Sequence, residues 1–362
     1  MSKGSGICAR QKEKDSKMDH KAKKLLTVTV PAYNSEFCLE KCLDSFCRED
    51  VLPRLEIIVV NDGSADGTSS IAHGYAERYP ESFRVIDKEN GGHGSTINAA
   101  VEKAGGKYFQ AVDSDDWVLT ENLPALLSIL DSASADMVLC DYHMVDKATG
   151  GRQPFRTEGI HLETCYPFEE FMRYPPGARK CCYFHGIIYR TEFYRQTGLR
   201  LPEKTFYEDQ IYAIIPAFYA KSVLPTGLFV YQYQVGNPAQ SISNDNQVRN
   251  LSQIEKILWT ICDFYDAHSD MTPERKNYFL FKLCNLLESY YAAGFLKDSN
   301  RKRGYDTARK MRETVRRRCP ELATMSERGY QIAKGLHFLH IRADTLEKMK
   351  RTKIYYMLRK HI

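Results

Sequence analysis

The sequence predicts an α/β protein with a mainly parallel sheet flanked by helices, followed by a helical C-terminal region. Three observations support this prediction. Short β-prone runs alternate with amphipathic helical patterns in the first half of the chain, which is typical of βαβ units. Each run ends in polar, loop-forming residues, and ligands bind beyond the carboxyl ends of such strands. From about residue 248 onward the periodicity is helical.

The first two strands are predicted within Leu25–Asn34 (LLTVTVPAYN) and Leu55–Thr68 (LEIIVVNDGSADGT). Both are β-rich and largely apolar, as expected for strands that are buried on both faces of a parallel sheet. An amphipathic helical pattern follows each strand. In the first pattern, Cys38 and Cys42 lie one helical turn apart, and we expect them to be small core residues.

A third strand is predicted at Phe83–Asp87, followed by the loop Asn90–Ser95 (NGGHGS). We expect Ser95 to cap a short helix that ends at Gly105. His93 could reach a phosphate from this loop, but a loop histidine is more often simply solvated. The loop is not a dinucleotide-binding fingerprint, because it follows the third strand and lacks the GxGxxG spacing.

The fourth strand, within Tyr108–Val118 (YFQAVDSDDWV), carries the carboxylates of Asp113, Asp115 and Asp116 at its C-terminal end. Three crowded like charges are stable mainly where a cation or abundant water lies opposite them. Oxygen ligands of this kind suit Mg²⁺ or Mn²⁺, which usually also bind substrate phosphate oxygens. The alternative is that DSDD only turns the chain and caps the next helix.

The segments PAYN, NDGSADGT, NGGHGSTINAA and AVDSDDW occur in the order and spacing that resemble the catalytic domain of bacterial family 2 glycosyltransferases. The resemblance covers roughly Leu25 to Ser243, and four ordered motifs are far more specific than any one of them. It implies a Rossmann-like GT-A fold with a mixed, mainly parallel sheet. It also implies an inverting enzyme that uses a nucleotide diphosphosugar.

The resemblance implies roles only at matching positions. Pro31–Tyr33 match the segment that wraps around the nucleoside in family members, and Asp62 matches the Asp that hydrogen-bonds uracil in members that use UDP. Asn90 and Gly91 match the loop beside the nucleotide, and Lys88 is close enough to this loop to offer charge to a phosphate. Asn61 departs from the family, which usually has a second Asp there. The expected donor-binding residues are Pro31, Ala32, Tyr33, Asp62, Lys88, Asn90, Gly91 and Asp113. Asp113 and Asp115 match the DXD pair and are the expected ligands of Mg²⁺ or Mn²⁺.

The segment Thr205–Tyr219 (TFYEDQIYAIIPAFY) has a helical apolar face that places Glu208 and Asp209 in the first turn. Carboxylates are favoured there by the helix dipole, so the pair could be purely structural. By resemblance, Asp209 is the expected general base and Glu208 a positioning group or acceptor contact. His185 is a minor candidate, because a histidine before a strand is more often structural. The segment Gln240–Ser243 (QSIS) resembles a stretch that returns to the donor side.

Charge and cysteine content limit the possible roles of the N-terminal tail and of the cysteines. Residues 1–24 carry eight Lys/Arg and three Asp/Glu, which accounts for the net charge of +5. We expect this basic tail to be disordered, and it lacks the apolar region of a secretory signal. The eleven cysteines show no paired framework and fit reduced thiols, and Cys181, Cys182 and His185 lack the second ligand pair of a zinc site.

Residues 248–362 are expected to form a basic helical region, with one helix starting at Thr272-Pro273 and breaking near Gly294. Residues 347–362 (EKMKRTKIYYMLRKHI) combine six Lys/Arg with apolar residues. They resemble a helix at a membrane surface, although a solvated basic helix is at least as common. No nucleic-acid recognition motif accompanies this charge. The predicted division is a tail over 1–24, a GT-A catalytic domain over 25–247 and the helical region over 248–362.

The sequence therefore predicts an inverting glycosyltransferase that moves a sugar from a nucleotide diphosphosugar, expected to be a UDP-sugar, to an acceptor hydroxyl. The expected acceptor is a glycan or lipid-linked glycan of cell-envelope or polysaccharide biosynthesis, as is common in the family. The expected location is the cytoplasm, with peripheral contact at the anionic inner face of the membrane. The alternative is a non-catalytic relative that binds nucleotide-sugars or glycans, and a nucleotidyltransferase is a distant third.

Overall fold

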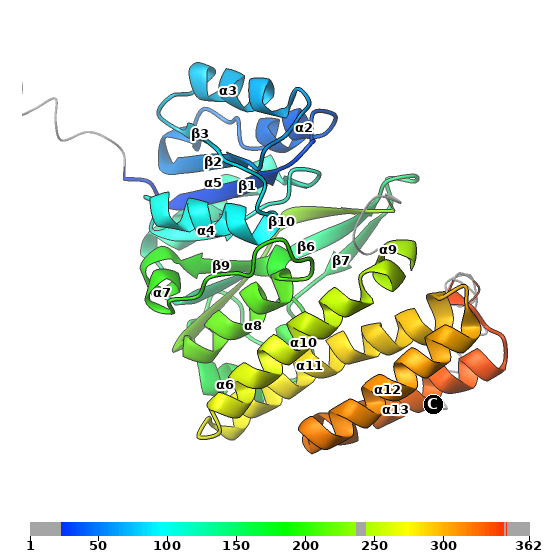
Figure 1. Cartoon of the computed structure of the whole chain (residues 1–362). Helices are drawn as coiled ribbons and strands as arrows, with labels where there is room; N and C mark the ends of the chain where they lie inside the picture. Colours follow the sequence, from blue (N-terminus) through cyan, green and yellow to red (C-terminus); the bar gives the residue numbers. More distant parts are fainter. Residues whose placement is uncertain (1–22, 237–243, 344, 346–362) are drawn as a thin grey trace, which may run out of the picture.

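The computed structural model describes residues 23–236, 244–343 and 345 (Figure 1). Most of the expected basic tail, the segment Gln240–Ser243 and the C-terminal stretch 347–362 lie outside the described residues. Within the described ranges, no helix is long and apolar enough to cross a membrane.

The described chain forms one mixed sheet with strand order β3-β2-β1-β4-β9-β6-β10-β5, with β7 paired to β6 and β8 to β10. Strands β3, β2, β1 and β4 are mutually parallel, β6 is parallel to β10, and β9 runs antiparallel between β4 and β6. The bounds are β1 Leu26–Ala32, β2 Leu55–Asn61, β3 Phe83–Asp87, β4 Tyr108–Ala111, β5 Trp117–Val118, β6 Met137–Asp146, β7 Arg152–Phe155, β8 Tyr166–Pro167, β9 Ile187–Arg190 and β10 Ser222–Val235. This architecture confirms the predicted fold class.

Helices cover both faces of the sheet (Figure 1). The helices of the sheet region are α2 Leu39–Asp44, α3 Thr68–Arg78, α4 His93–Lys103, α5 Leu123–Ser132, α6 Phe168–Arg173, α7 Thr191–Gln196 and α8 Asp209–Tyr219. Single turns lie at η1 Leu52–Arg54, η2 Thr120–Asn122, η3 Pro176–Arg179 and η4 Phe184–Gly186. One apolar core joins the sheet to α2, α3 and α5, and a second joins it to α4, α7, α8 and the C-terminal helices.

The predicted burial of the first two strands is confirmed. Every residue of β1 and of β2 is buried, which explains why both sequences are β-rich and largely apolar. Cys42 is fully buried on α2 and Cys38 half-buried.

The C-terminal helices are α9 Asn244–Arg249, α10 Leu251–Ala267, α11 Pro273–Ala292, α12 Arg301–Arg318 and α13 Pro320–Phe338, with a wider turn, η5, at Ala293–Lys297. Helix α11 starts as predicted, with Thr272 accepting a hydrogen bond from the amide of Arg275. The guanidinium of Arg275 in turn donates to the carbonyls of Ala217 (3.1 Å) and Ala220 (2.8 Å), at the end of α8. Carbonyls at a helix end lack intrahelical partners, so this contact fastens α11 to α8.

The prediction that Ser95 caps the helix after the third strand is wrong. Helix α4 begins at His93, two residues before Ser95, and its cap position is Gly92, which has a φ of 84°. Ser95 lies inside the first turn, where its hydroxyl donates to the carbonyl of Gly92 at 2.7 Å. A left-handed φ strains residues with a side chain, so the glycine permits the earlier start.

Candidate active site

A cleft of about 420 Å³ opens beyond the carboxyl ends of β1, β2 and β4. Its lining residues come from the end of β1, from five loops and from helix α4: Pro31, Ala32, Tyr33, Ser35, Asp62, Asn90, Gly92, His93, Thr96, Asp113, Ser114, Asp115, Lys204, Thr205 and Phe206. Seven of the predicted site residues are among them, namely Pro31, Ala32, Tyr33, Asp62, Asn90, Asp113 and Asp115. Lys88, Gly91, Glu208 and Asp209 lie outside this lining. The parallel strand order explains why motifs far apart in sequence meet here.

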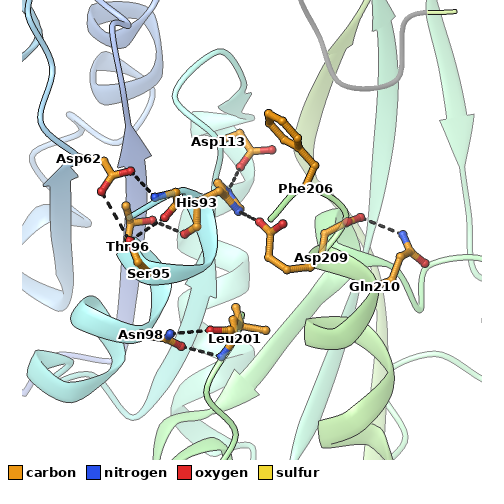
Figure 2. Close-up of polar contacts among 12 residues, drawn as sticks. Asp62, His93, Ser95, Thr96, Asn98, Asp113, Leu201, Phe206, Asp209 and Gln210 are labelled. Atoms are coloured by element: carbon orange, nitrogen blue, oxygen red, sulfur yellow. Dashed lines mark hydrogen bonds and ion pairs between the residues drawn. The ribbon is translucent and has the colours of Figure 1, made fainter. Parts of the chain in front are cut away.

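Asp62, which follows β2, holds the loop between β3 and α4. Its Oδ1 accepts hydrogen bonds from the ammonium of Lys88 (2.8 Å) and the amide of Gly91 (2.9 Å). Its Oδ2 accepts from the amide of Gly92 at 2.8 Å (Figure 2). The side chain is almost fully buried, so these three donors offset the cost of burying its charge. Asp62 therefore shapes the loop at the edge of the cleft.

Asn61, the departure from the family pattern, has a local structural role. Its amide nitrogen donates to Asp87 at 2.8 Å, and its side-chain oxygen accepts from the amide of Ser64 at 3.1 Å. A neutral side chain can donate to one partner and accept from another, which a carboxylate cannot do. The asparagine thus joins the end of β3 to the turn after β2.

The three carboxylates of DSDD have different environments. Asp113 and Asp115 line the cleft, whereas Asp116 is buried and accepts from the hydroxyl of Tyr231 and the amide of Gln234, both at 2.7 Å. Burial, together with the neighbouring charges of Asp115 and Asp113, raises the pKa of Asp116 well above its ordinary value. Two of the carboxylates thus face the cleft and the third is fixed within the fold.

His185, between β6 and β9, lies beside this carboxylate cluster. Ligand atoms of Asp113, Asp116 and His185 all lie within 4.8 Å of one another. The His185 ring stacks on Tyr233 with centroids 3.9 Å apart, and burial lowers its pKa to about 4, which favours the neutral form. Carboxylate oxygens suit Mg²⁺ and Mn²⁺, and an imidazole nitrogen suits transition-metal ions, so the donor types of this grouping fit a divalent ion. Among the described residues, the group of ligand atoms that lie this close to Asp113 includes those of His185 and Asp116 but not those of Asp115.

His93, the first residue of α4, bridges the two halves of the site (Figure 2). Its Nε2 lies 2.8 Å from Oδ1 of Asp113, and its Nδ1 lies 2.5 Å from Oε1 of Glu208. Burial alone would lower the pKa of His93, but the charges and hydrogen bonds of Asp113 and Glu208 raise it well above its ordinary value. The interpretation of His93 as a solvated loop residue is therefore wrong. Sequence spacing carries no signal for a contact between residues 93 and 208.

Glu208 and Asp209 lie at the start of α8, as predicted, with Glu208 at the cap position and Asp209 as the first helical residue. Glu208 is buried, while Asp209 is half-buried and accepts from the side-chain amide of Gln210 at 2.9 Å. Burial and the adjacent charge of Glu208 raise the pKa of Asp209 to about 6. A carboxylate with a pKa close to neutrality is suited to accept a proton during a reaction.

The segment before α8 forms one wall of the cleft, which the sequence did not indicate. Lys204, Thr205 and Phe206 line the cleft, and the Phe206 side chain is exposed. Helix α10 fixes this segment, because Lys256 donates to the Thr205 hydroxyl at 3.0 Å and the Phe206 amide donates to the side chain of Gln253 at 2.7 Å. The C-terminal helices thus contribute indirectly to the shape of the site.

Comparison with known proteins yields one family and several relatives. Residues 27–198 match the model of "Glycosyl transferase family 2". The chain is 31% identical over 211 residues to EpsJ, an uncharacterized glycosyltransferase of Bacillus subtilis, covering 58% of this chain and 61% of EpsJ. It is 29% identical over 216 residues to the putative glycosyltransferase EpsH of the same organism, covering 58% and 60%. The chain therefore spans about three fifths of the length of these relatives.

A solved structure with the same fold is that of S. aureus TarS 1-349 in complex with UDP-GlcNAc. The TM-score is 0.52 at 19% sequence identity, and the alignment covers 88% of this chain and 92% of that one. At this identity the likeness concerns the fold. Because the alignment covers 88% of this chain, the likeness extends beyond the region matched by the family model, which ends at residue 198.

Proposed function

The chain belongs to glycosyl transferase family 2, and we propose that it is an inverting glycosyltransferase that moves a sugar from a UDP-sugar to an acceptor hydroxyl. The observation that carries this proposal is the His93 bridge, which joins the DSDD carboxylate Asp113 to the Glu208-Asp209 pair. A transferase needs a donor site and a base close together. A protein that only binds the donor needs no such base.

We assign donor binding to the cleft. Pro31–Tyr33 would contact the nucleoside, while Lys88 and the loop at Asn90-Gly91 would lie beside the diphosphate. Asp62 has a proposed double role, since its carboxylate holds this loop and its side chain also lines the cleft where a uracil would lie. The fold accommodates a UDP-sugar in TarS, and this supports the choice of donor.

We propose that Asp113 and Asp115 hold Mg²⁺ or Mn²⁺. Such an ion would neutralise the negative charge that develops on the leaving diphosphate. The support comes from the crowded carboxylates of DSDD, two of which line the cleft, and from the imidazole of His185 close to them.

Asp209 is the proposed general base. In an inverting transfer, the acceptor hydroxyl attacks the anomeric carbon from the side opposite the leaving diphosphate, and its proton must go to a base. Asp209 would take this proton, and its raised pKa keeps it basic enough to do so near neutral pH. Glu208 would hold the pair in place through His93.

A panel of nucleotide-sugars, scored by release of the nucleoside diphosphate with and without Mn²⁺, tests the proposed function. We expect release from a UDP-sugar that depends on the metal and rises when a glycan acceptor is added. Calorimetry with UDP, GDP, CDP and dTDP tests the nucleotide separately, and preferential binding of GDP would contradict the donor assignment. Tight binding of UDP-sugars without any release would favour the non-catalytic relative.

We further propose that residues 25–247 are the catalytic unit and that the region 248–362 places the enzyme on the inner face of an anionic membrane, where a lipid-linked or cell-envelope glycan would be the acceptor. Phe338 and Leu339 are strongly exposed at the end of α13. Lys334 lies near the ring of Phe338, and the basic stretch 347–362 follows in the sequence. Exposed apolar side chains next to cationic ones suit the interface of an anionic bilayer.

A further inference from the structure

Helix α4 and the segment before α8 are joined at several points along their length. The carbonyl of Gly91 accepts from the amide of Lys204 at 2.7 Å. About two turns further along the chain, on α4, Asn98 exchanges two hydrogen bonds of 2.9 Å with the backbone of Leu201 (Figure 2). Between these contacts, Gly94 lies so close to Pro202 that an added Cβ would come within 2.5 Å of its carbonyl oxygen.

The backbone is held in place both before and after His93. Asp62 holds the two amides that precede it, and the hydroxyl of Thr96 donates to the carbonyl of His93 at 2.6 Å. The ring itself faces Phe184, with centroids 5.7 Å apart. A side chain held from so many directions is suited to place other groups accurately, because its own rotamer is determined by packing.

The two partners of His93 belong to different functional groups of the site. Asp113 follows β4 and lines the cleft, whereas Glu208 precedes the candidate base Asp209 and is buried. Both ring nitrogens of His93 are used, one for each carboxylate. A residue with a single polar atom could bind one partner, but the five-membered ring can reach both at once.

We propose that His93 is a positioning residue for the transfer reaction: by bridging Asp113 and Glu208 it sets the distance between the donor and the base Asp209. This inference rests on the proposed function. It assigns His93 no contact with the reacting atoms. Removing the bridge would leave the donor site formed by Pro31–Tyr33 and Asp62 in place, but would let the start of α8 move relative to Asp113. A shift of about 1 Å in such a geometry can lower a rate about a hundredfold.

The test compares wild type, His93→Gln, Glu208→Gln and the double variant. A glutamine at position 93 can bond one carboxylate but not both. We expect the rate of transfer at saturating donor to fall about tenfold to a hundredfold in His93→Gln, while the Kd for the UDP-sugar, measured by calorimetry with Mn²⁺, changes less than about threefold. The double variant should be little slower than His93→Gln alone, since residues that act as a unit are not additive.

His73→Gln is a matched control. His73 on α3 also pairs with a carboxylate, Asp87, at 2.8 Å, but both side chains are about half exposed and neither lines the cleft. We expect this variant to transfer sugar like wild type. Because the control removes the same kind of pair, it separates loss of the bridge from loss of any histidine–carboxylate contact.

Three results would overturn the inference. Unchanged transfer in His93→Gln would show that the bridge is dispensable, and multiplicative losses in the double variant would show that the two side chains act independently. A weakened donor Kd with an unchanged rate would make His93 a donor-binding residue. The coupling between His93 and Glu208 can also be measured without any reaction. It follows from the thermal unfolding midpoints of the wild type, the two single variants and the double variant. If these midpoints show coupling while the wild type transfers no sugar, the proposed function fails as well and the bridge is only structural.

Discussion

At the scale of single residues, the chemistry of the site depends on how differently its carboxylates are surrounded. Asp62 and Asp116 each accept several hydrogen bonds within the fold. Asp209 accepts one from its neighbour Gln210, and burial raises its pKa to about 6. Carboxylates whose environments push their pKa values apart commonly have different roles in one reaction.

The raised pKa of Asp209 gives a pH prediction. A base must be ionised, so kcat/KM should rise with pH through about 6, whereas an ordinary aspartate would remain active down to about pH 4. Asp209→Asn should keep donor binding but lower transfer about 10²- to 10⁴-fold. Rate profiles of wild type and variant between pH 4.5 and 8 check this. If Glu208→Gln instead removes the fall of kcat/KM at low pH, the roles within the pair are reversed.

The proposed metal site gives a second prediction. Asp115→Ala should reduce turnover to the level of EDTA-treated wild type, because a ligand that lines the cleft is lost while the buried Asp116 still holds the fold. Asp131→Ala is a suitable control, since Asp131 makes an exposed surface pair with Arg54. Circular dichroism verifies folding, and Mn²⁺ titration by calorimetry measures the ion directly. Full activity of wild type in EDTA would contradict the metal requirement.

At the scale of elements, the junction between α4 and the segment before α8 decides whether the two halves of the site meet. Gly94→Ala tests it. Alanine normally stabilises a helix by up to about 1 kcal/mol relative to glycine. Here the new Cβ would lie 2.5 Å from the Pro202 carbonyl and 3.1 Å from the Glu208 side chain, so the segment must shift. We expect a lower unfolding midpoint together with slower transfer.

Gly74→Ala on α3 is the matched control for this substitution. Nothing lies within 4 Å of the position that its Cβ would take, so only the higher helix propensity of alanine should change the free energy of unfolding. We expect a small gain in stability, about 0.5–1 kcal/mol, and unchanged transfer. If both variants behave alike in thermal unfolding and in transfer, the contact between α4 and Pro202 has no role in the site.

Elements with a local signal were predictable from the sequence. Thr272-Pro273 marks the start of α11 because a cap residue and a proline at the first helical position act within one turn. The burial of β1 and β2 follows from their β-rich, apolar composition. The start of α4 was missed because Gly92, with its left-handed φ, and the bonds of Asp62 allow the helix to begin before Ser95.

The candidate site was predictable to the extent that motifs lie at strand ends. DSDD and the Asp62 turn reach one cleft because their strands are parallel neighbours of β1. The bridge of His93 to Glu208, the wall formed by Lys204 to Phe206 and the approach of His185 to Asp113 were not predictable. These contacts join residues about 70 to 115 positions apart, and only the packed fold brings them together.

At the scale of the whole molecule, the C-terminal helices support the site and also carry exposed basic side chains. Helix α10 fixes the wall of the cleft, and α11 is fastened to α8 by Arg275. On the outer helix α12, Lys302, Arg309 and Arg317 are exposed. A catalytic unit held in this way could be oriented on a membrane by its outer helices without any change at the cleft.

Membrane attachment gives the last prediction. Residues 347–362, outside the described part of the chain, contain six Lys/Arg, and each contributes about 1 kcal/mol of attraction near an anionic bilayer. Deleting them should move the protein from the pellet to the supernatant when it is sedimented with phosphatidylserine vesicles at low salt, while UDP release from the donor persists. Replacing the six cations by glutamine keeps the length and should have the same effect, because charge provides most of the attraction. If the full-length chain does not bind phosphatidylserine vesicles, or binds phosphatidylcholine vesicles equally well, the basic stretch is a solvated segment. A soluble acceptor then becomes the better expectation.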